Sequence, residues 1–409
     1  MLHPDPFEDL RAEVSAAPNS RARGLGVTLR WRSREAGHVD SRLLPCPEPE
    51  ALSPGLRSLL DVGSGGTLTH SFEAGELVPD WRSERLVTIP GGFFRRTHGR
   101  LQVEPRAGRF YPGSFLSEAP GLPPGPPTAF RVTSIAADGE MNVDFNHPLA
   151  GLALDLDFRV LDRAPGGEAP VDLGRAAVTN GPGMQARWRG QPTDFHSGDP
   201  VARGDPGPDA DFYAVPRMVH HLDDTARGRI AHLYRSLLPD GADVLDLMSS
   251  WTSHLDERAR LSRVAGLGMN AEELAANPML TERVVQDLNA EPRLPWPDSR
   301  FDAALCTVSV EYLVRPLEVF REVRRVLRPG GRFVITFSNR WFPPKAIALW
   351  AQLHEFERMG LVLEFFLGAG GFGALKTWSL RGLPRPPEDQ YAGSLPTSDP
   401  VYAIWGDAV

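Results

Sequence analysis

The chain of 409 residues is poor in cysteine, in lysine and in long apolar runs. Its two cysteines, Cys46 and Cys306, are too few for a disulfide framework, so we expect a reducing cytoplasm. No run of 18 or more apolar residues occurs, so no membrane-spanning helix is expected. The first residues also lack the basic and apolar regions of a signal peptide.

Lysine occurs only at Lys345 and Lys376, so arginine carries almost all of the positive charge. The net charge of −8 argues against a general binder of nucleic acid or of membrane surfaces. A hydrophobic content of 41% and a charged content of 23% are typical of a globular protein. The 40 glycines and 39 prolines indicate long loops and linkers, and the length suffices for two or three domains.

Residues 26–162 follow a polar lead-in of residues 1–25 and have the alternating pattern of β-strands. Four runs carry the pattern: 27–32, 68–72, 130–135 and 152–160. Glycine-containing turn signals separate them. This part of the chain is therefore predicted to be a β-rich domain.

Residues 163–208 are rich in proline and glycine and are predicted to be a linker. After it, residues 222–238 have the spacing of a helix, with Ile230, Leu233, Tyr234 and Leu237 on one stripe. Strands and helices then alternate, which is typical of a mostly parallel sheet with helices on both faces. We therefore predict a doubly wound α/β domain over residues 209–409.

Three segments of this α/β domain lie in a characteristic order. Residues 243–247 (DVLDL) lie in the first predicted strand (242–247), and residues 301–306 (FDAALC) lead into the fourth (303–308). Residues 327–335 (LRPGGRFVI) form a tight turn and the fifth strand. This pattern resembles class I S-adenosylmethionine (SAM) dependent methyltransferases of the type 11-like group. The resemblance implies a Rossmann-like fold and SAM as the cofactor.

The loop after the first strand departs from that family. Its three usual glycine positions hold Met248, Ser250 and Thr252. In one reading, hydroxyl groups hold the cofactor's carboxylate near a helix N-terminus and Trp251 walls the site. In the other, the loop has lost the cofactor and only caps a helix.

The resemblance also assigns the other strand ends. The family's usual ribose-binding acid is replaced by Gly268, and Asn270 either contacts the ribose or caps the next helix. Asp287 is expected to accept from the adenine amino group, beside the backbone of the next residue. The full set of expected cofactor-binding residues is Asp246, Met248, Ser249, Ser250, Trp251, Met269, Asn270, Asp287, Leu288 and Val308.

The residues expected to surround the methyl acceptor are less sharply defined. Tyr312 stands where relatives carry a histidine that lines the methyl-transfer site. His221 and Asp223 are the best candidates for a general base, although Asp223 or Asp224 can instead cap the following helix. Residues 338–346 form either a substrate wall or an ordinary loop with buried aromatic residues.

Residues 143–151 (VDFNHPLAG) are similar to the segment of SlyD-like FKBP-type prolyl isomerases that returns from the inserted flap. The resemblance implies an α+β FKBP-like module that binds peptides, either as a docking domain or as an isomerase. A β-rich structural domain in which this segment merely forms a turn is the alternative. His147 alone does not suggest a metal site, so no metal is expected.

These observations favour a SAM-dependent methyltransferase with an FKBP-like accessory domain. A non-catalytic binding or scaffold protein and a prolyl isomerase with an inactive methyltransferase domain are the alternatives. The methyl acceptor, a small molecule or a protein, cannot be named from the sequence, and neither nucleic acid nor membrane is expected as a partner.

Overall fold

The computed structural model describes residues 7, 23–62, 66–98, 101–116, 121–122, 129–161, 165 and 167–409. The predicted lead-in of residues 1–25 therefore lies mostly outside the described residues. Phe7, which is described, is buried and packs onto Gly26.

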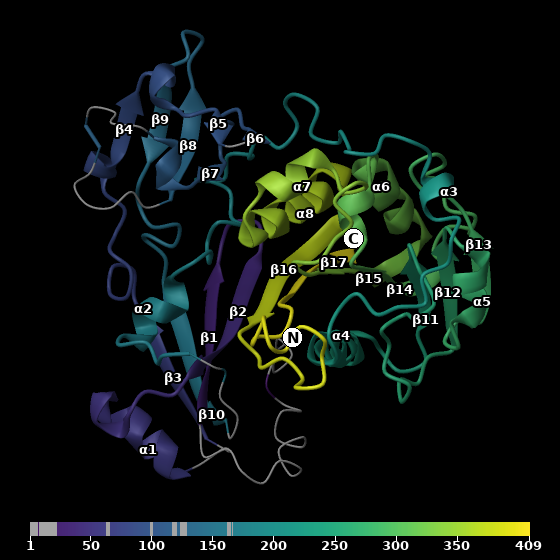
Figure 1. The fold of residues 1–409 in the computed structure, drawn as a ribbon, viewed down its shortest axis with the longest axis horizontal. Helices are drawn as coiled ribbons and strands as arrows, with labels where there is room; N and C mark the ends of the chain where they lie inside the picture. The colour runs from purple at the N-terminus through teal and green to yellow at the C-terminus, as the bar shows by residue number, and fades with distance from the viewer. Residues whose placement is uncertain are drawn as a thin grey trace.

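A large mixed sheet runs through the molecule (Figure 1). Its C-terminal half has the order β13-β12-β11-β14-β15-β17-β16, with β11 to β15 parallel to one another and β17 antiparallel to both of its neighbours. These strands are β11 (Asp243–Leu247), β12 (Arg263–Gly268), β13 (Glu282–Val285), β14 (Phe301–Thr307), β15 (Leu327–Phe337), β16 (Phe372–Arg381) and β17 (Val401–Ala408). The chain winds outward from β11 to β13 and then returns to β14, so the predicted Rossmann-like sheet is confirmed. The switch point lies between β11 and β14.

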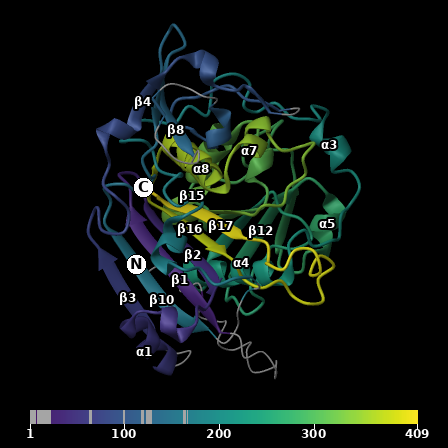
Figure 2. The same ribbon diagram turned by 60° about the vertical axis from the view of Figure 1, so that its left-hand side comes forward.

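Helices cover both faces of this half of the sheet (Figures 1 and 2). They are α4 (Asp224–Leu237), α5 (Ala271–Ala276), α6 (Pro316–Val326), α7 (Ala348–Gln352) and α8 (Glu355–Ala369). The apolar stripes of α6 and α8 share one core cluster, and those of α4 and α5 share another. The predicted stripe of α4 is buried as expected, and the apolar face of α6 is buried too. Within the described part of the chain, no helix is both long and apolar enough to cross a bilayer.

The N-terminal strands extend the same sheet. β2 pairs in parallel with β16, and the order then continues β2-β1-β10-β3 with antiparallel pairing. Their bounds are β1 (Gly24–Arg32), β2 (Gly37–Pro45), β3 (Thr67–Phe72) and β10 (Leu154–Leu161), with α1 (Pro54–Val62) and α2 (Leu173–Val178) packed beside them. Four strands of the predicted β-rich region are thus continuous with the α/β sheet.

Buried polar residues fix the register between β2 and β16. His38 Nδ1 lies 2.8 Å from Thr377 Oγ1, and Ser379 Oγ donates to Asp40 Oδ1 at 2.6 Å. Arg381 pairs with the other oxygen of Asp40 at 2.5 Å. A shift of one residue would separate these partners and leave buried polar groups unpaired.

A smaller sheet with the order β4-β9-β8-β7 is inserted between β3 and β10. Its strands are β4 (Leu86–Ile89), β7 (Phe110–Tyr111), β8 (Phe130–Ile135) and β9 (Met141–Asp144), with a pair β5 (Thr97–His98) and β6 (Leu101–Gln102) nearby. Residues 143–151 lead from this sheet back to β10, as the FKBP resemblance implies. That connection does not establish an FKBP-like fold.

The predicted linker is not an extended tether where it is described. It contains α2, and Arg187 forms a bidentate ion pair with Glu364 of α8 at 2.7 Å. Short helical segments complete the chain: α3 (Asp209–Phe212) and the 3-10 turns Pro49–Ala51, Ser83–Arg85, Gly91–Phe93, Gly113–Phe115 and Val310–Tyr312.

Candidate functional site

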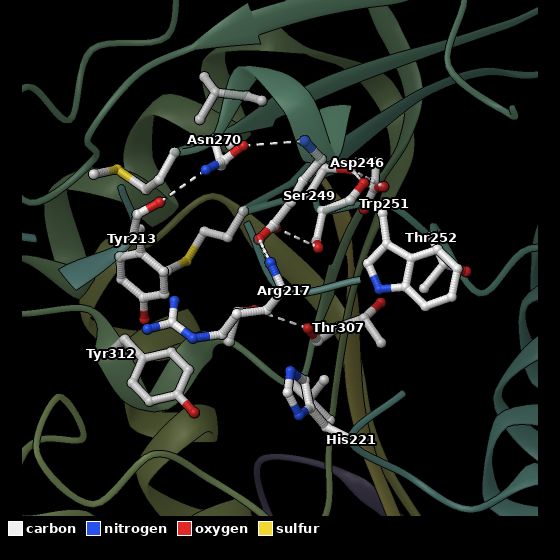
Figure 3. A pocket seen from close by; sticks show the side chains of 18 of the residues that line it. Tyr213, Arg217, His221, Asp246, Ser249, Trp251, Thr252, Asn270, Thr307 and Tyr312 are labelled. Carbon is white, nitrogen blue, oxygen red and sulfur yellow. Dashed lines mark hydrogen bonds between the residues drawn. The ribbon is translucent and has the colours of Figure 1, made fainter. Parts of the chain in front are cut away.

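A pocket of about 1180 Å³, including its open mouth, lies at the switch point of the sheet (Figure 3). Its walls come from the ends of β11, β12, β13 and β14, from residues 213–222, which we call the capping segment, and from the loop after β15. The residues that line it include Tyr213, Arg217, His221, Asp246, Met248, Ser249, Ser250, Trp251, Met269, Asn270, Glu273, Asp287, Leu288, Val308, Tyr312 and Phe342. Ligands of open α/β sheets bind at this position.

The loop after β11 keeps a glycine-like backbone at one of its three substituted positions. Met248 has φ of 56°, in the left-handed region that costs most residues about 1–2 kcal/mol. The next residue, Ser249, donates its backbone N–H to Leu267 O at 2.7 Å, which ties the loop to β12. The chain therefore makes this turn without glycine.

The serine hydroxyls of the loop bind carboxylates of the protein. Ser249 Oγ donates to Asp246 Oδ2 at 2.5 Å, and Ser250 Oγ donates to Glu273 Oε2 at 2.6 Å. Burial raises the pKa of Asp246 to about 6, and hydrogen bonds from Ser249 and Ser253 limit the rise. Each serine oxygen can still accept a hydrogen bond from a ligand. That these hydroxyls contact the cofactor stays a prediction.

Trp251 joins the loop to the capping segment. Its Nε1 donates to Val219 O at 3.3 Å, and its ring stacks on His220 with the ring centroids 4.5 Å apart. Trp251 thus lies at the side of the pocket as a wall (Figure 3).

At the end of β12, Asn270 caps α5. Its Oδ1 accepts from the backbone N–H groups of Glu272 and Glu273, and its Nδ2 donates to Tyr213 O and Ala214 O. These four contacts fill the hydrogen-bonding capacity of a side-chain amide. Of its two predicted roles, the structure therefore contains the cap, and a ribose contact would require one of these bonds to break.

The remaining predicted cofactor residues also lie at the pocket. Asp287 is half-buried, and its Oδ1 accepts the backbone N–H of Asn289 at 2.8 Å. Met269, Leu288 and Val308 supply apolar lining. An adenine contact by Asp287 stays a prediction.

Two of the three predicted catalytic residues line the pocket. His221 is exposed at the pocket, and partial desolvation, with Arg217 adding to the effect, lowers the pKa of its imidazole. A neutral imidazole can accept a proton. Burial, together with the Glu311 charge, raises the pKa of Tyr312 well above its usual value. Tyr312 Oη accepts the backbone N–H of Phe342 at 2.8 Å. A protonated, anchored tyrosine suits a wall better than a base.

Asp223, the third predicted catalytic residue, does not line the pocket. It caps α4 by accepting from Ala226 N at 3.0 Å, pairs with Arg385 at 3.2 Å and accepts from Asp399 N at 2.6 Å. Asp223 is therefore a helix cap and not a pocket residue, because hydrogen-bond donors already surround this buried carboxylate.

Sequence reasoning did not single out Arg217, Glu273 or Tyr213 as site residues. The guanidinium of Arg217 lies over the ring of Phe212 at 4.5 Å, and its Nη2 donates to Phe212 O at 2.9 Å. Its Nη1 is buried without a hydrogen-bond partner among the described residues. Tyr213 and Arg217 precede α4 in a stretch without periodicity, so no local pattern marked them.

Among the described residues, no group of three or more His, Cys, Asp or Glu side chains is arranged to hold a metal ion. The pocket histidines are not a cluster of free ligands. His254, for example, is half-buried, and desolvation lowers its pKa to about 4.

Residues 249–335 match the family model described as a methyltransferase domain. The chain is 31% identical to an uncharacterized 37.1 kDa protein in transposon Tn4556 of Streptomyces fradiae, over 30% of this chain and 39% of that protein. It is also 31% identical to a ubiquinone/menaquinone biosynthesis C-methyltransferase of Bartonella quintana, over 38% of this chain and 52% of that protein. The chain thus spans about half of these relatives or less.

A solved structure of a SAM-dependent methyltransferase from Thermotoga maritima is similar over 45% of this chain and 92% of that one, with 16% identity and a TM-score of 0.33. The matched segment 249–335 contributes most of the strand ends that line the pocket. The chain therefore contains a segment, residues 249–335, that matches a methyltransferase domain, and the cofactor that this match indicates is S-adenosyl-L-methionine.

Proposed function

We propose that the protein is an active SAM-dependent methyltransferase whose reaction takes place in the pocket at the switch point. The observation that carries the proposal is the position of this pocket, at the strand ends of a segment that matches a methyltransferase domain. When bound, SAM supplies a methyl group that its sulfonium activates for transfer.

The lining fits such a cofactor. Apolar side chains of Met269, Leu288 and Val308 suit the adenosine part, and Asp287 offers an acceptor beside them. Asp246 and the hydroxyls of Ser249 and Ser250 offer polar groups at the end of β11. The unpaired Nη1 of Arg217 can meet an anionic group of either ligand.

The other end of the pocket is proposed to bind the methyl acceptor. Tyr213, Tyr312 and Phe342 form an aromatic wall, and the rings of Tyr312 and Phe342 stack with their centroids 6.0 Å apart. Figure 3 shows Tyr213, Arg217 and Tyr312 gathered on one side of the pocket. His221, whose ring meets that of Phe342 edge-on at 5.0 Å, is the proposed base where the acceptor must lose a proton.

An aromatic acceptor is therefore our first choice. Flat rings stack well on aromatic walls, and two curated relatives are named as quinone-biosynthesis C-methyltransferases, from Bartonella quintana and Laribacter hongkongensis. Thiol, hydroxyl and amine acceptors, on a small molecule or on a protein, are the alternatives.

Calorimetric titration of the full chain with S-adenosylhomocysteine tests the cofactor site. We expect saturable one-to-one binding, and no binding at near-millimolar ligand would leave the non-catalytic binding protein as the better account. Incubation of a lysate with the protein and labelled SAM, followed by isolation of the labelled product, would then identify the acceptor.

Peptide binding by an FKBP-like N-terminal region is a second proposal. Phe145, Asn146, His147 and Pro148 line a cavity between the smaller sheet and α2, which supports a binding role for the segment that suggested it. Isomerisation of a proline test peptide by the full chain would support an isomerase, whereas peptide binding without turnover would support a docking module.

A reducing cytoplasm stays our proposed location, since Cys46 and Cys306 are both free.

A further inference from the structure

The end of β12 has no room for a side chain. A Cβ atom added to Gly268 would lie 2.1 Å from Ser249 O and 3.2 Å from a methyl group of Leu274. The backbone oxygen cannot give way unless the loop after β11 moves. Neither aspartate nor glutamate can therefore stand at this strand end, and a carboxylate at this part of the pocket must come from elsewhere.

Glu273 supplies one. It lies in the first turn of α5, only 9% of its surface is exposed, and it lines the pocket. Its Oε2 accepts from Ser250 Oγ at 2.6 Å and its Oε1 accepts the backbone N–H of Arg217 at 2.7 Å. A carboxylate offers about four acceptor positions, so roughly two remain for a ligand.

The other acids at the pocket are either more fully paired or lie in a different part of it. Asp209 accepts from Arg203 and Asn289 and lies 3.3 Å from Lys345 Nζ. Asp246 is buried at the base of the loop, where Ser249 and Ser253 donate to it. Asp287 follows β13, one strand further from the switch point.

We propose that Glu273 recognises the ribose diol of the cofactor in place of an acid at the end of β12. A vicinal diol presents two O–H donors, and a carboxylate next to the second strand of an α/β sheet is suited to accept them. Glu273 also accepts hydrogen bonds from Ser250 in the loop after β11 and from Arg217 in the capping segment. It therefore links these two walls of the pocket to the ribose. The inference rests on the proposed binding of SAM in this pocket.

The test compares S-adenosylhomocysteine with its 2′,3′-dideoxy analogue by calorimetry on the full chain. We expect wild-type protein to bind the parent ligand about 10- to 100-fold more tightly than the analogue, because the analogue lacks the hydroxyl groups that donate hydrogen bonds to the charged carboxylate. In Glu273→Gln we expect weaker binding of the parent ligand and a ratio of the two affinities close to one. Glu272→Gln, which changes an exposed acid in the same helical turn, should leave both affinities unchanged.

The ratio of the two affinities distinguishes recognition of the ribose by Glu273 from a purely structural role of this residue. If Glu273→Gln weakens both ligands equally and the ratio keeps its wild-type value, Glu273 only shapes the pocket and the inference is overturned. A wild-type ratio near one overturns it without any variant, which covers the case in which Glu273→Gln does not fold. If wild-type protein binds neither ligand, the proposed function fails as well.

Discussion

At the residue scale, two residues of the site differ from those usual in the family that the sequence resembles. Met248 takes a left-handed backbone conformation where glycine is usual, and Gly268 stands where an acid is usual. Both residues lie at the contact between the loop after β11 and the end of β12. The absent side chain at position 268 is what lets Ser249 approach β12 so closely.

Gly268→Ala tests this contact. Because the new Cβ would meet Ser249 O, we expect a loss of about 1–3 kcal/mol in the free energy of unfolding and weaker binding of S-adenosylhomocysteine. The matched control is Gly228→Ala in α4, where nothing lies within 4 Å of the added Cβ. The control should gain about 0.5–1 kcal/mol, since alanine favours a helix over glycine. Equal effects of the two changes on urea unfolding would contradict the steric argument.

Asp246 gives a pH-dependent prediction. Its pKa in the folded protein is about 6, above the usual 3.8, because burial disfavours the charge. The folded state therefore holds the proton more tightly than the unfolded state, and this stabilisation is lost as the pH rises from about 4 through 6. A rise from 3.8 to about 6 corresponds to roughly 3 kcal/mol.

Asp246→Asn removes this titration. The stability of the variant relative to wild type should increase by up to about 3 kcal/mol between pH 4 and pH 7, as measured by urea unfolding at both pH values. Glu311, whose pKa burial raises to about 8, is present in both proteins and cancels in the comparison. A difference that stays constant with pH would show that Asp246 is not the group that titrates.

At the element scale, the junction between β2 and β16 decides how the two halves of the chain meet. An uncovered β16 would present an open row of backbone donors and acceptors. Asp40, which is 2% exposed, accepts from both Ser379 and Arg381 across this junction. The pairing thus combines backbone hydrogen bonds with a buried charge pair.

Asp40→Ala should lower the free energy of unfolding by about 3–5 kcal/mol, because it leaves the Arg381 guanidinium buried without its carboxylate. Asp155→Ala is the matched control, since Asp155 is an exposed acid on β10 of the same sheet that accepts from Ser71. Its loss should cost less than about 1 kcal/mol. Denaturant unfolding of the two variants should therefore differ widely, and similar values would contradict a special role for the junction.

At the scale of the whole molecule, contacts far apart in sequence join the smaller sheet to the helix layer. Phe110 N donates to Glu357 Oε1 of α8 at 2.8 Å, and Arg109 Nη2 donates to Gln352 O at 3.0 Å. Together with the β2–β16 junction, these contacts tie the N-terminal strands to the domain that carries the site. The N-terminal part is therefore a structural component of the α/β domain as well as a proposed binding module.

We expect the full chain to unfold in one transition, with far-UV and near-UV circular dichroism changing together. A fragment of residues 209–409 exposes the edge of β16 and should aggregate or unfold at a lower temperature than the full chain. Two well-separated transitions of the full chain, with a fragment as stable as the intact protein, would show instead that the halves are independent.

The sequence by itself determined the local elements and their order. Alternating residues at 152–160 predicted a strand, and the stripe at Ile230, Leu233 and Tyr234 predicted a buried helix face, because side-chain periodicity follows directly from backbone geometry. The order of these elements was enough to predict the winding of β11 to β15.

The tertiary structure alone decided how those elements meet. Strand β2 joins β16 although His38 and Thr377 are 339 residues apart, and Arg217 and Glu273 reach one pocket from segments with no shared motif. The sequence left Asp223 as either a base or a cap, and its surroundings make it a cap. Edge pairing, steric room and donor placement depend on contacts between distant residues, and no local pattern records them.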